Sequence, residues 1–454
     1  MTQDLKNTKI HRLLWQLSIP AILGMLSSAI FNIVDRIFVG KISTTALTAV
    51  GITMPIQVLQ MAFVLLIGIG SSSLISIKLG ENKKEEAEYI LRMAFKGIIL
   101  FLIAFAILFL VFLEPTLRIL SIPEEVIPDA KIYIIIIIVG SIIGIPGYCL
   151  NNSLRSIGQA KISMNIIMIT SILNIILDPI FIFGFKMGIA GAAIGTVISQ
   201  TILTIYVVWA FCKRKDFMIH LHLTKIALSN KNDLVVSSIK MGLPSFYVQI
   251  LATVVNLFIN KSILKYGTDL DIASITIISS IFSFYHMVIF GLVQGNNAIC
   301  GYNWGAKQYA RVKSSLMLSM GYALGLSTLL FAVIQVWPQF IVNLFTDDPV
   351  LAKNSAHGIR LYLAMLPLLG VQTIGTQYFQ AVGKAKLSSQ LSFLRYGLIV
   401  IPFVLLLAPR YGSDGIYISN AVSDGIASIV AIIFVWKEYV HLKRLTKERM
   451  EANA

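Results

Sequence analysis

The chain has 454 residues, of which 56% are hydrophobic and 13% are charged, and its mean hydropathy is +0.80. Soluble globular proteins have about 25% charged residues, so this composition excludes a soluble domain and indicates a protein that crosses a membrane many times. The net charge of +15 fits basic cytoplasmic loops summed over many spans, and we do not interpret it as nucleic-acid binding.

Twelve segments of the chain are long and apolar enough to cross the hydrocarbon core of a bilayer, which takes about 20 residues as a helix. Only helices and closed barrels satisfy the backbone in lipid, and such uniformly apolar segments predict helices. In chain order the predicted spans are residues 13–40, 46–77, 93–113, 131–153, 162–185, 188–212, 236–264, 272–300, 314–345, 357–382, 388–408 and 415–437. We therefore expect an all-α polytopic membrane protein.

The basic residues predict how these spans are oriented. With the amino terminus placed in the cytoplasm, 27 of the 37 Lys and Arg residues fall on the cytoplasmic side and 10 on the other side. Such a surplus is the rule for cytoplasmic loops. We expect a multi-pass protein of the cell membrane with both termini in the cytoplasm.

The two halves of the chain resemble each other at an offset of about 224 residues. "SIP" at 18–20 aligns with "GLP" at 242–244, and "RSIGQAK" at 155–161 aligns with "QAVGKAK" at 380–386. An even number of spans in each half predicts two six-helix bundles related by a pseudo-two-fold axis along the membrane normal. The predicted parts are an amino-terminal lobe (1–212), a cytoplasmic linker (213–235), a carboxyl-terminal lobe (236–440) and a cytoplasmic tail (441–454).

Three acidic residues fall well inside predicted spans, namely Asp35, Asp178 and Asp424. A charge within a bilayer costs at least about 2.5–3.5 kcal/mol and suggests a functional site. Asn174 precedes Asp178 by four residues, so both lie on one helix face, and Thr196 lies at a similar depth in the next span. We predict that Asp35, Asn174, Asp178 and Thr196 form a coupling site for a proton or cation.

The second half of the chain does not repeat these acids, because Ile259 and Phe403 stand at the positions equivalent to Asp35 and Asp178. This asymmetry assigns coupling to the amino-terminal lobe. Burial and like-charge repulsion favour protonated carboxyl groups, whereas the same oxygen atoms are hard ligands suited to Na⁺. The residues therefore leave H⁺ and Na⁺ both open, and no other cofactor is expected. The roles of Asp424 and His286 also stay open.

Several stretches resemble the multidrug and toxic compound extrusion (MATE) family, and within it the MepA-like bacterial branch. They are "SIPAILGML" at 18–26, "IVDRIFVG" at 33–40, "LRSIGQAK" at 154–161, "NIILDPIFIFG" at 174–184 and "GAAIGT" at 191–196. The resemblance covers the whole chain and implies a transporter, not an enzyme. It implies export of cationic amphipathic drugs in exchange for H⁺ or Na⁺ by alternating access, with the predicted coupling residues on the family's cation or proton site.

The resemblance also implies a drug cavity between the lobes and places Asn151 on its lining. Further polar and methionine residues are candidates for this lining, since flexible Met-rich surfaces accept varied partners. They are Asn32, Met54, Gln57, Met61, Gln249, Asn256, Met287 and Gln372.

Two alternative functions remain, a lipid-linked sugar flippase of the same superfamily and an intramembrane aspartyl protease built on Asp35 and Asp178. We expect a monomer.

Overall fold

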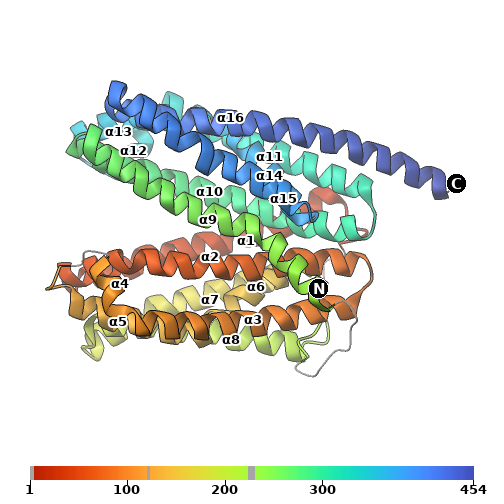
Figure 1. The fold of residues 1–454 in the computed structure, drawn as a ribbon, viewed down its shortest axis with the longest axis horizontal. Helices are drawn as coiled ribbons and strands as arrows, with labels where there is room; N and C mark the ends of the chain where they lie inside the picture. The colour runs from red at the N-terminus through yellow and green to blue at the C-terminus, as the bar shows by residue number, and fades with distance from the viewer. Residues whose placement is uncertain (1–4, 120–122, 223–230, 454) are drawn as a thin grey trace. The chain divides into compact units, whose positions relative to one another are not determined.

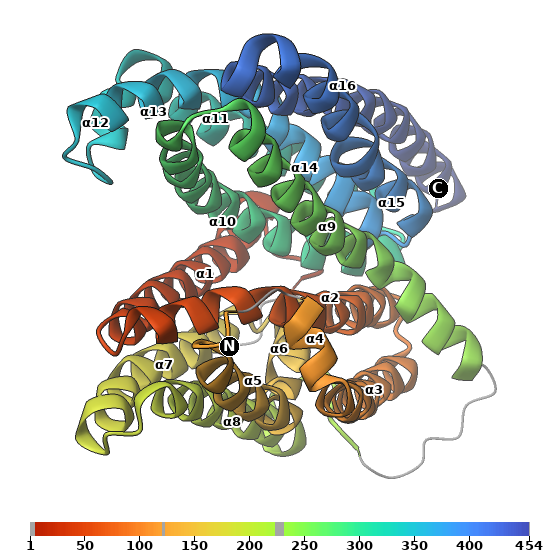
Figure 2. The same ribbon diagram turned by 60° about the vertical axis from the view of Figure 1, so that its left-hand side comes forward.

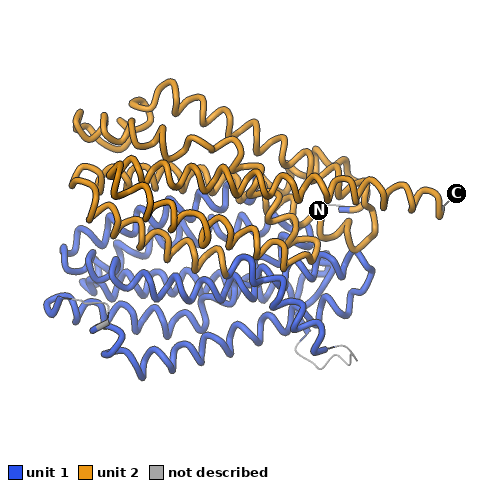
Figure 3. The backbone as a smooth tube through the Cα atoms, turned by 45° about the horizontal axis from the view of Figure 1, so that its top comes forward, with its two compact units in different colours: residues 1–5, 19–246 blue, residues 6–18, 247–454 orange. Residues whose placement is uncertain are grey.

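The computed structural model describes residues 5–119, 123–222 and 231–453, and these are almost entirely helical (Figure 1). Residues 223–230 of the predicted linker lie outside the described residues. The chain forms two compact units (Figure 3): unit 1 comprises residues 1–5 and 19–246, and unit 2 comprises residues 6–18 and 247–454. Two helices, α1 (Ile10–Gly40) and α9 (Lys231–Tyr266), each contribute residues to both units.

Unit 1 consists of most of α1, the first turns of α9 and the elements between them. These are α2 (Thr44–Gly80), α3 (Lys84–Val111), α4 (Leu113–Ile119), α5 (Ile127–Gly144), α6 (Pro146–Ser156), α7 (Ala160–Pro179), the π-helical turn η1 (Ile180–Gly184) and α8 (Gly188–Lys213). Helix α5 lies beside α8 (Figure 2) and also packs against α2 and α3. Because α5 is surrounded in this way, its residues Ile134 and Ile138 are almost fully buried.

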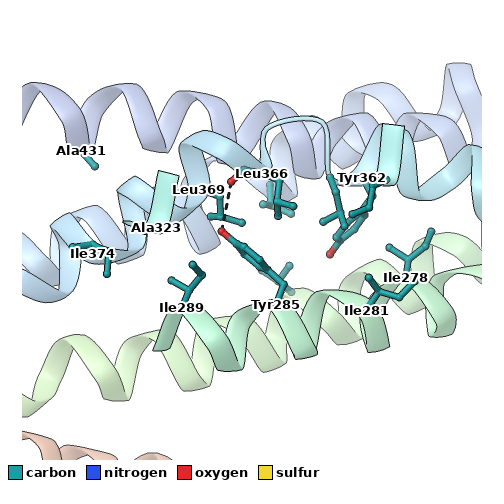
Figure 4. Close-up of a cluster of buried hydrophobic side chains, with 14 of the residues drawn as sticks. Ile278, Ile281, Tyr285, Ile289, Ala323, Tyr362, Leu366, Leu369, Ile374 and Ala431 are labelled. Carbon is teal, nitrogen blue, oxygen red and sulfur yellow. Dashed lines mark hydrogen bonds between the residues drawn. The ribbon is translucent and has the colours of Figure 1, made fainter. Parts of the chain in front are cut away.

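Unit 2 consists of the first turns of α1, the remainder of α9 and the elements that follow. These are α10 (Asp269–Gly305), α11 (Tyr309–Val336), α12 (Pro338–Val342), α13 (Pro349–Tyr362), α14 (Leu366–Ala381), α15 (Ala385–Phe393), the π-helical segment η2 (Leu394–Ile399) and α16 (Val400–Asn453). In its core the Tyr285 hydroxyl donates to the Leu366 carbonyl oxygen at 3.5 Å (Figure 4) and shares a hydrogen bond with Ser327 Oγ at 2.8 Å.

Each of the twelve predicted spans lies on helical structure. Among the described residues, ten helices are long and apolar enough to cross a membrane, or eleven when α13 and α14, bent by 51°, count as one span. The last of them, Ala385–Ala452, holds two predicted spans, because Gly412 has non-helical dihedral angles (φ 59°, ψ −136°). A Cβ at Gly415 would lie 2.4 Å from the Leu407 carbonyl oxygen, so the chain turns back on itself here.

Proline interrupts two predicted spans that the sequence gives as single segments. The span 131–153 is divided into α5 and α6, with Pro146 as the first residue of α6, and the span 314–345 is divided by Pro338. Proline has no N–H to continue the preceding helix, yet it suits the first turn of a new one. The structure thus corrects the continuity of these spans, although their positions in the chain agree with the prediction.

Helix α3 shows why the exterior of the protein belongs in lipid. Leu100, Ile107 and Val111 are 70%, 60% and 68% exposed, whereas Ile98 and Leu102 on the same helix are fully buried. A helix that is apolar on its outward face as well as its inward face needs an apolar solvent. The exposed leucine, isoleucine and valine side chains therefore contact hydrocarbon, and the protein is a multi-pass membrane protein.

Glycine allows one close helix crossing in each unit, and the two crossings are equivalent in the repeat. In unit 1, a Cβ at Gly70 on α2 would lie 2.2 Å from the Ser238 carbonyl oxygen of α9, and a Cβ at Gly242 would lie 1.8 Å from the Leu66 carbonyl oxygen. In unit 2, a Cβ at Gly295 on α10 would lie 2.2 Å from Ser18 Oγ of α1. Both pairs, 70 with 295 and 18 with 242, are separated by the repeat offset, so the duplicated halves share this packing.

Ion pairs join the end of α2 to the start of α3, outside the membrane-spanning segments. Lys78 Nζ lies 3.0 Å from carboxylate oxygens of both Glu81 and Glu86, and Lys83 Nζ lies 3.0 Å from Glu81 Oε2. Partial burial would raise the pKa of Glu81, but hydrogen bonds and attraction from Lys83 and Lys78 outweigh it and hold this pKa below its usual value. The short turn at residues 81–83 is therefore fixed electrostatically as well as by the backbone.

Candidate ion-coupling site in unit 1

Asp178 and Asn174 lie on the buried face of α7, one helical turn apart. Asp178 is fully buried and Asn174 is 1% exposed. Asn174 Nδ2 donates to Asp178 Oδ1 at 3.1 Å and approaches Thr196 Oγ1 of α8 at 3.4 Å. Three of the four predicted coupling residues are therefore brought together by direct side-chain contacts across two helices.

Local backbone features position the Asp178 carboxylate. Pro179 follows it and ends the regular α-helical pattern, and the π-helical turn η1 continues the chain. Such π-helical turns are frequent at functional sites. On the facing helix α8, Gly195 leaves room for the Asp178 carboxylate, since a Cβ at position 195 would lie 2.6 Å from Asp178 Oδ1. The carboxylate thus occupies a space that any larger residue at position 195 would remove.

Asp35 on α1 is the fourth predicted member, and its half-buried carboxylate interacts with that of Asp178. The neighbouring Arg36 does not pair with it through a short salt bridge. Instead, Arg36 Nη2 donates to Met54 Sδ at 3.4 Å. This agrees with the expectation that adjacent helical residues do not face each other, and it leaves the two carboxylates as mutual neighbours.

Tyr133 on α5 is a site residue that the sequence reasoning missed. Its side chain is 6% exposed, hydrogen-bonds with Gln57, and lies within electrostatic range of Asp35 and Asp178. A tyrosine near a span end is ordinary at a membrane interface and does not by itself indicate a site. The sequence offered one indication of Tyr133, namely its position two residues into the predicted span 131–153.

The donor set suits a proton or a small hard cation. Asp178 Oδ2 and Asn174 Oδ1 are buried, and neither has a hydrogen-bond partner among the described residues. Buried polar atoms are almost always paired, so two unpaired oxygen atoms a helical turn apart are available to a further ligand. A proton on Asp178 would satisfy one of them, and Na⁺ would satisfy both, because oxygen is its preferred ligand.

The candidate drug-cavity residues are in varied surroundings. Asn32 is exposed and donates to the Ser28 carbonyl oxygen at 2.7 Å, and Asn256 is exposed on α9. Half-buried positions are held by Gln57, Gln249 and Met287, while Met54 is 39% and Met61 38% exposed. Asn151 on α6 is 2% exposed, and its Oδ1 has no hydrogen-bond partner among the described residues. The cavity these residues were expected to line stays a prediction.

A separate cavity lies within unit 2. Its lining includes Gln372, whose Nε2 donates to Thr376 Oγ1 at 3.2 Å, and the ring of His286. It also includes Arg395, whose Nε donates to Asp424 Oδ1 at 2.7 Å with both side chains buried. Asp424 is therefore held in a buried ion pair with Arg395.

Comparison with known proteins places this architecture in a family. A sequence profile of the MatE family matches residues 20–180 and 244–406, one stretch in each repeat. The multidrug export protein MepA of Staphylococcus aureus (strain N315) is 27% identical over 452 residues, which cover 98% of this chain and 97% of that protein. MepA of Staphylococcus saprophyticus is 24% identical over 447 residues with the same coverage.

Solved structures show the same fold. The outward-facing conformation of a multidrug resistance MATE family transporter of the MOP superfamily superimposes with a TM-score of 0.91 at 22% identity, covering 98% of this chain and 99% of that one. A MOP superfamily transporter from Pyrococcus furiosus, whose binding pocket has reverse polarity, gives a TM-score of 0.88 at 23% identity. With twelve helical spans in two bundles and a profile match in both repeats, the chain belongs to the MatE family of multidrug and toxic compound extrusion proteins.

Proposed function

We propose that this chain is a secondary active exporter of cationic, amphipathic and aromatic drugs, driven by entry of H⁺ or Na⁺ at the cluster of Asp35, Asn174, Asp178 and Thr196. The membership of the MatE family and the names of the MepA relatives support multidrug export. The single observation that carries the coupling assignment is the fully buried Asp178 carboxylate with an unpaired oxygen atom.

The chemistry of the cluster suits a reversible ion load. An ionised carboxylate without a cation partner is costly in a low-dielectric interior, and a second carboxylate beside it adds repulsion. Uptake of a proton or Na⁺ relieves both costs, so the loaded and unloaded states differ in free energy. That difference is what an alternating-access cycle needs in order to drive drug release, because a ligand shifts a conformational equilibrium only by its differential affinity.

We further propose the orientation and organisation that the sequence predicts. Both termini lie in the cytoplasm, and the protein acts as a monomer in the cell membrane. The lobes comprise residues 1–212 and 236–440, joined by the linker 213–235 and followed by the tail 441–454. The surplus of basic residues on one side supports this orientation.

The test is efflux of a cationic dye from everted vesicles, with a pH gradient and a Na⁺ gradient imposed separately. Wild-type protein should respond to one gradient or both. Asp178→Asn and Asp35→Asn should abolish the gradient-driven part of dye efflux. An amide takes up no proton near neutral pH, and it binds a cation more weakly than a carboxylate does. Asp414→Asn is the matched control, because Asp414 is an exposed acid paired with His357. Full coupled transport by the Asp35→Asn, Asp178→Asn double variant would refute the site.

The alternative, a lipid-linked sugar flippase, needs cationic groups that can bind pyrophosphate. Arg395 lines the cavity of unit 2, but its guanidinium is committed to Asp424. The same vesicles separate the two functions, since a flippase would move a fluorescent lipid pyrophosphate and would not extrude dye.

A further inference from the structure

Three potential metal ligands meet in unit 1 where α8 ends and α3 begins. Glu88 lies in the second turn of α3 and is 7% exposed, while His220 and His222 follow α8 in the segment 214–222. One ligand atom from each residue can be chosen so that all lie within 4.8 Å of one another. Glu88 lies 132 residues before His220 in the chain, so only the fold brings these side chains together.

The distances between the histidine nitrogen atoms and the Glu88 carboxylate oxygen atoms are longer than hydrogen bonds and closer to the spacing of ligands around one metal ion. His220 Nδ1 lies 3.8 Å from Glu88 Oε1, and His222 Nε2 lies 3.7 Å from Glu88 Oε2. Both distances exceed a hydrogen bond, which is at most about 3.2 Å for N–H···O. Two ligands bound about 2.1 Å from a tetrahedral ion are about 3.4 Å apart, so both Glu88–His distances lie within a few tenths of an ångström of that spacing.

The tautomer of His220 supports the same conclusion. His220 Nε2 lies 3.1 Å from the Arg214 carbonyl oxygen, and a carbonyl oxygen only accepts, so Nε2 carries the proton. Nδ1, 3.8 Å from Glu88 Oε1, is then the ring nitrogen that is free to bind a cation. Metal-ligating histidines commonly donate their second N–H to a backbone carbonyl in this way.

We propose that Glu88, His220 and His222 bind one divalent transition-metal ion of the Zn²⁺ type. Two imidazoles and a carboxylate are a ligand set that Zn²⁺ accepts, with water in the fourth position. Glu88 is already organised for this role, since its Oε1 accepts a hydrogen bond from the backbone N–H of His220 at 3.0 Å. The ion would fasten the segment 214–222 to the first turns of α3.

Two charged groups, Lys84 and Arg214, compete only weakly with a metal ion for this cluster. Lys84 Nζ lies 3.7 Å from Glu88 Oε1, but the Lys84 side chain is 55% exposed and can turn into solvent. Arg214 donates through Nε and Nη2 to Asp216 at 3.0 Å, so that guanidinium is occupied elsewhere. A metal ion can therefore displace the lysine without leaving a buried charge unpaired.

The experiment uses full-length protein purified in detergent without a histidine tag and treated with a chelator. Isothermal titration with Zn²⁺ should show one site per chain, and Co²⁺ at the same site should give visible absorption bands of a four-coordinate ion. His222→Ala should weaken Zn²⁺ binding at least tenfold. Because the His222 side chain is 52% exposed, this variant should fold normally, as size-exclusion chromatography would confirm.

Two further variants keep the test decisive. Glu88→Gln retains an acceptor for the His220 N–H but loses the charge, so it should also lose Zn²⁺ binding while folding. His357→Ala removes an exposed histidine paired with Asp414 and should bind Zn²⁺ like the wild type. Absence of a stoichiometric site in the wild type, or equal binding by wild type and His222→Ala, would overturn the proposal, whatever the outcome of the transport assays.

Discussion

Removing the carboxylate of Asp424 should destabilise unit 2, and this would settle a role that the sequence leaves open. Arg395 Nε lies 2.7 Å from Asp424 Oδ1, and their side chains are only 6% and 4% exposed. Breaking a buried ion pair from one side typically costs about 3–5 kcal/mol, since the remaining charge is left without a partner. Because Arg395 also lines the cavity of unit 2, we take the lower end of this range, about 3 kcal/mol.

The assay is thermal unfolding of purified Asp424→Ala in detergent, followed by loss of the monodisperse peak in size-exclusion chromatography. For a unit of about 200 residues, 3 kcal/mol corresponds to a fall in Tm of roughly 6–12 °C. Replacing both partners by apolar residues, Arg395→Met with Asp424→Leu, removes the charge along with its partner and should recover most of this loss.

A matched control is available at the exposed pair of His357 and Asp414, whose side chains are 58% and 44% exposed. Asp414→Ala should cost at most about 1 kcal/mol, as exposed pairs usually do. The reasoning would be refuted if the double replacement were as unstable as Asp424→Ala, or if Asp414→Ala were equally damaging.

Three further changes test local packing and charge. Gly195→Ala would put a carbon atom 2.6 Å from Asp178 Oδ1. Gradient-driven dye efflux should therefore fall about tenfold or more in a protein that still folds. Unchanged efflux would show that the carboxylate can move aside. Gly242→Ala should lower Tm because overpacking costs about 1–3 kcal/mol, whereas Gly97→Ala, with open space around it, should not. The folded-state pKa of Glu81 is depressed below 4.5. The ionised Glu81 carboxylate therefore stabilises the folded protein above about pH 4.5, and this stabilisation is lost as the pH falls through the folded-state pKa. The Tm advantage of wild type over Glu81→Gln, worth less than about 1 kcal/mol, should therefore disappear in acid, and an advantage that grew in acid would contradict this assignment.

The spans and the duplicated plan could be predicted because lipid imposes simple rules on a sequence. Helix length is set by bilayer thickness, and backbone groups in hydrocarbon must be paired within the helix. The rules say less about breaks within spans. Pro146 and Pro338 were visible in the sequence, yet whether a proline kinks a helix or divides it depends on neighbours that can satisfy the freed carbonyl groups.

The candidate site was predictable only in part. The pairing of Asn174 with Asp178 follows from helical periodicity alone, and the structure has this contact at 3.1 Å. The pairing of Asp424 with Arg395 could not be foreseen, because these residues lie 29 positions apart on separate helical segments and only tertiary packing joins them. Tyr133 was missed for a related reason, since its neighbours come from other helices.

The paired glycine crossings carry a consequence for how such a protein can be made. Gly70 of the first repeat is covered by Ser238 and Gly242, which belong to the second, while Gly295 of the second repeat is covered by Ser18 of the first. Neither repeat alone holds all the pieces of one compact unit. A fragment ending at residue 212 would therefore lack the α9 residues that cover Gly70, and a fragment beginning at residue 236 would lack Ser18, so we expect neither fragment to fold into a complete unit when expressed alone.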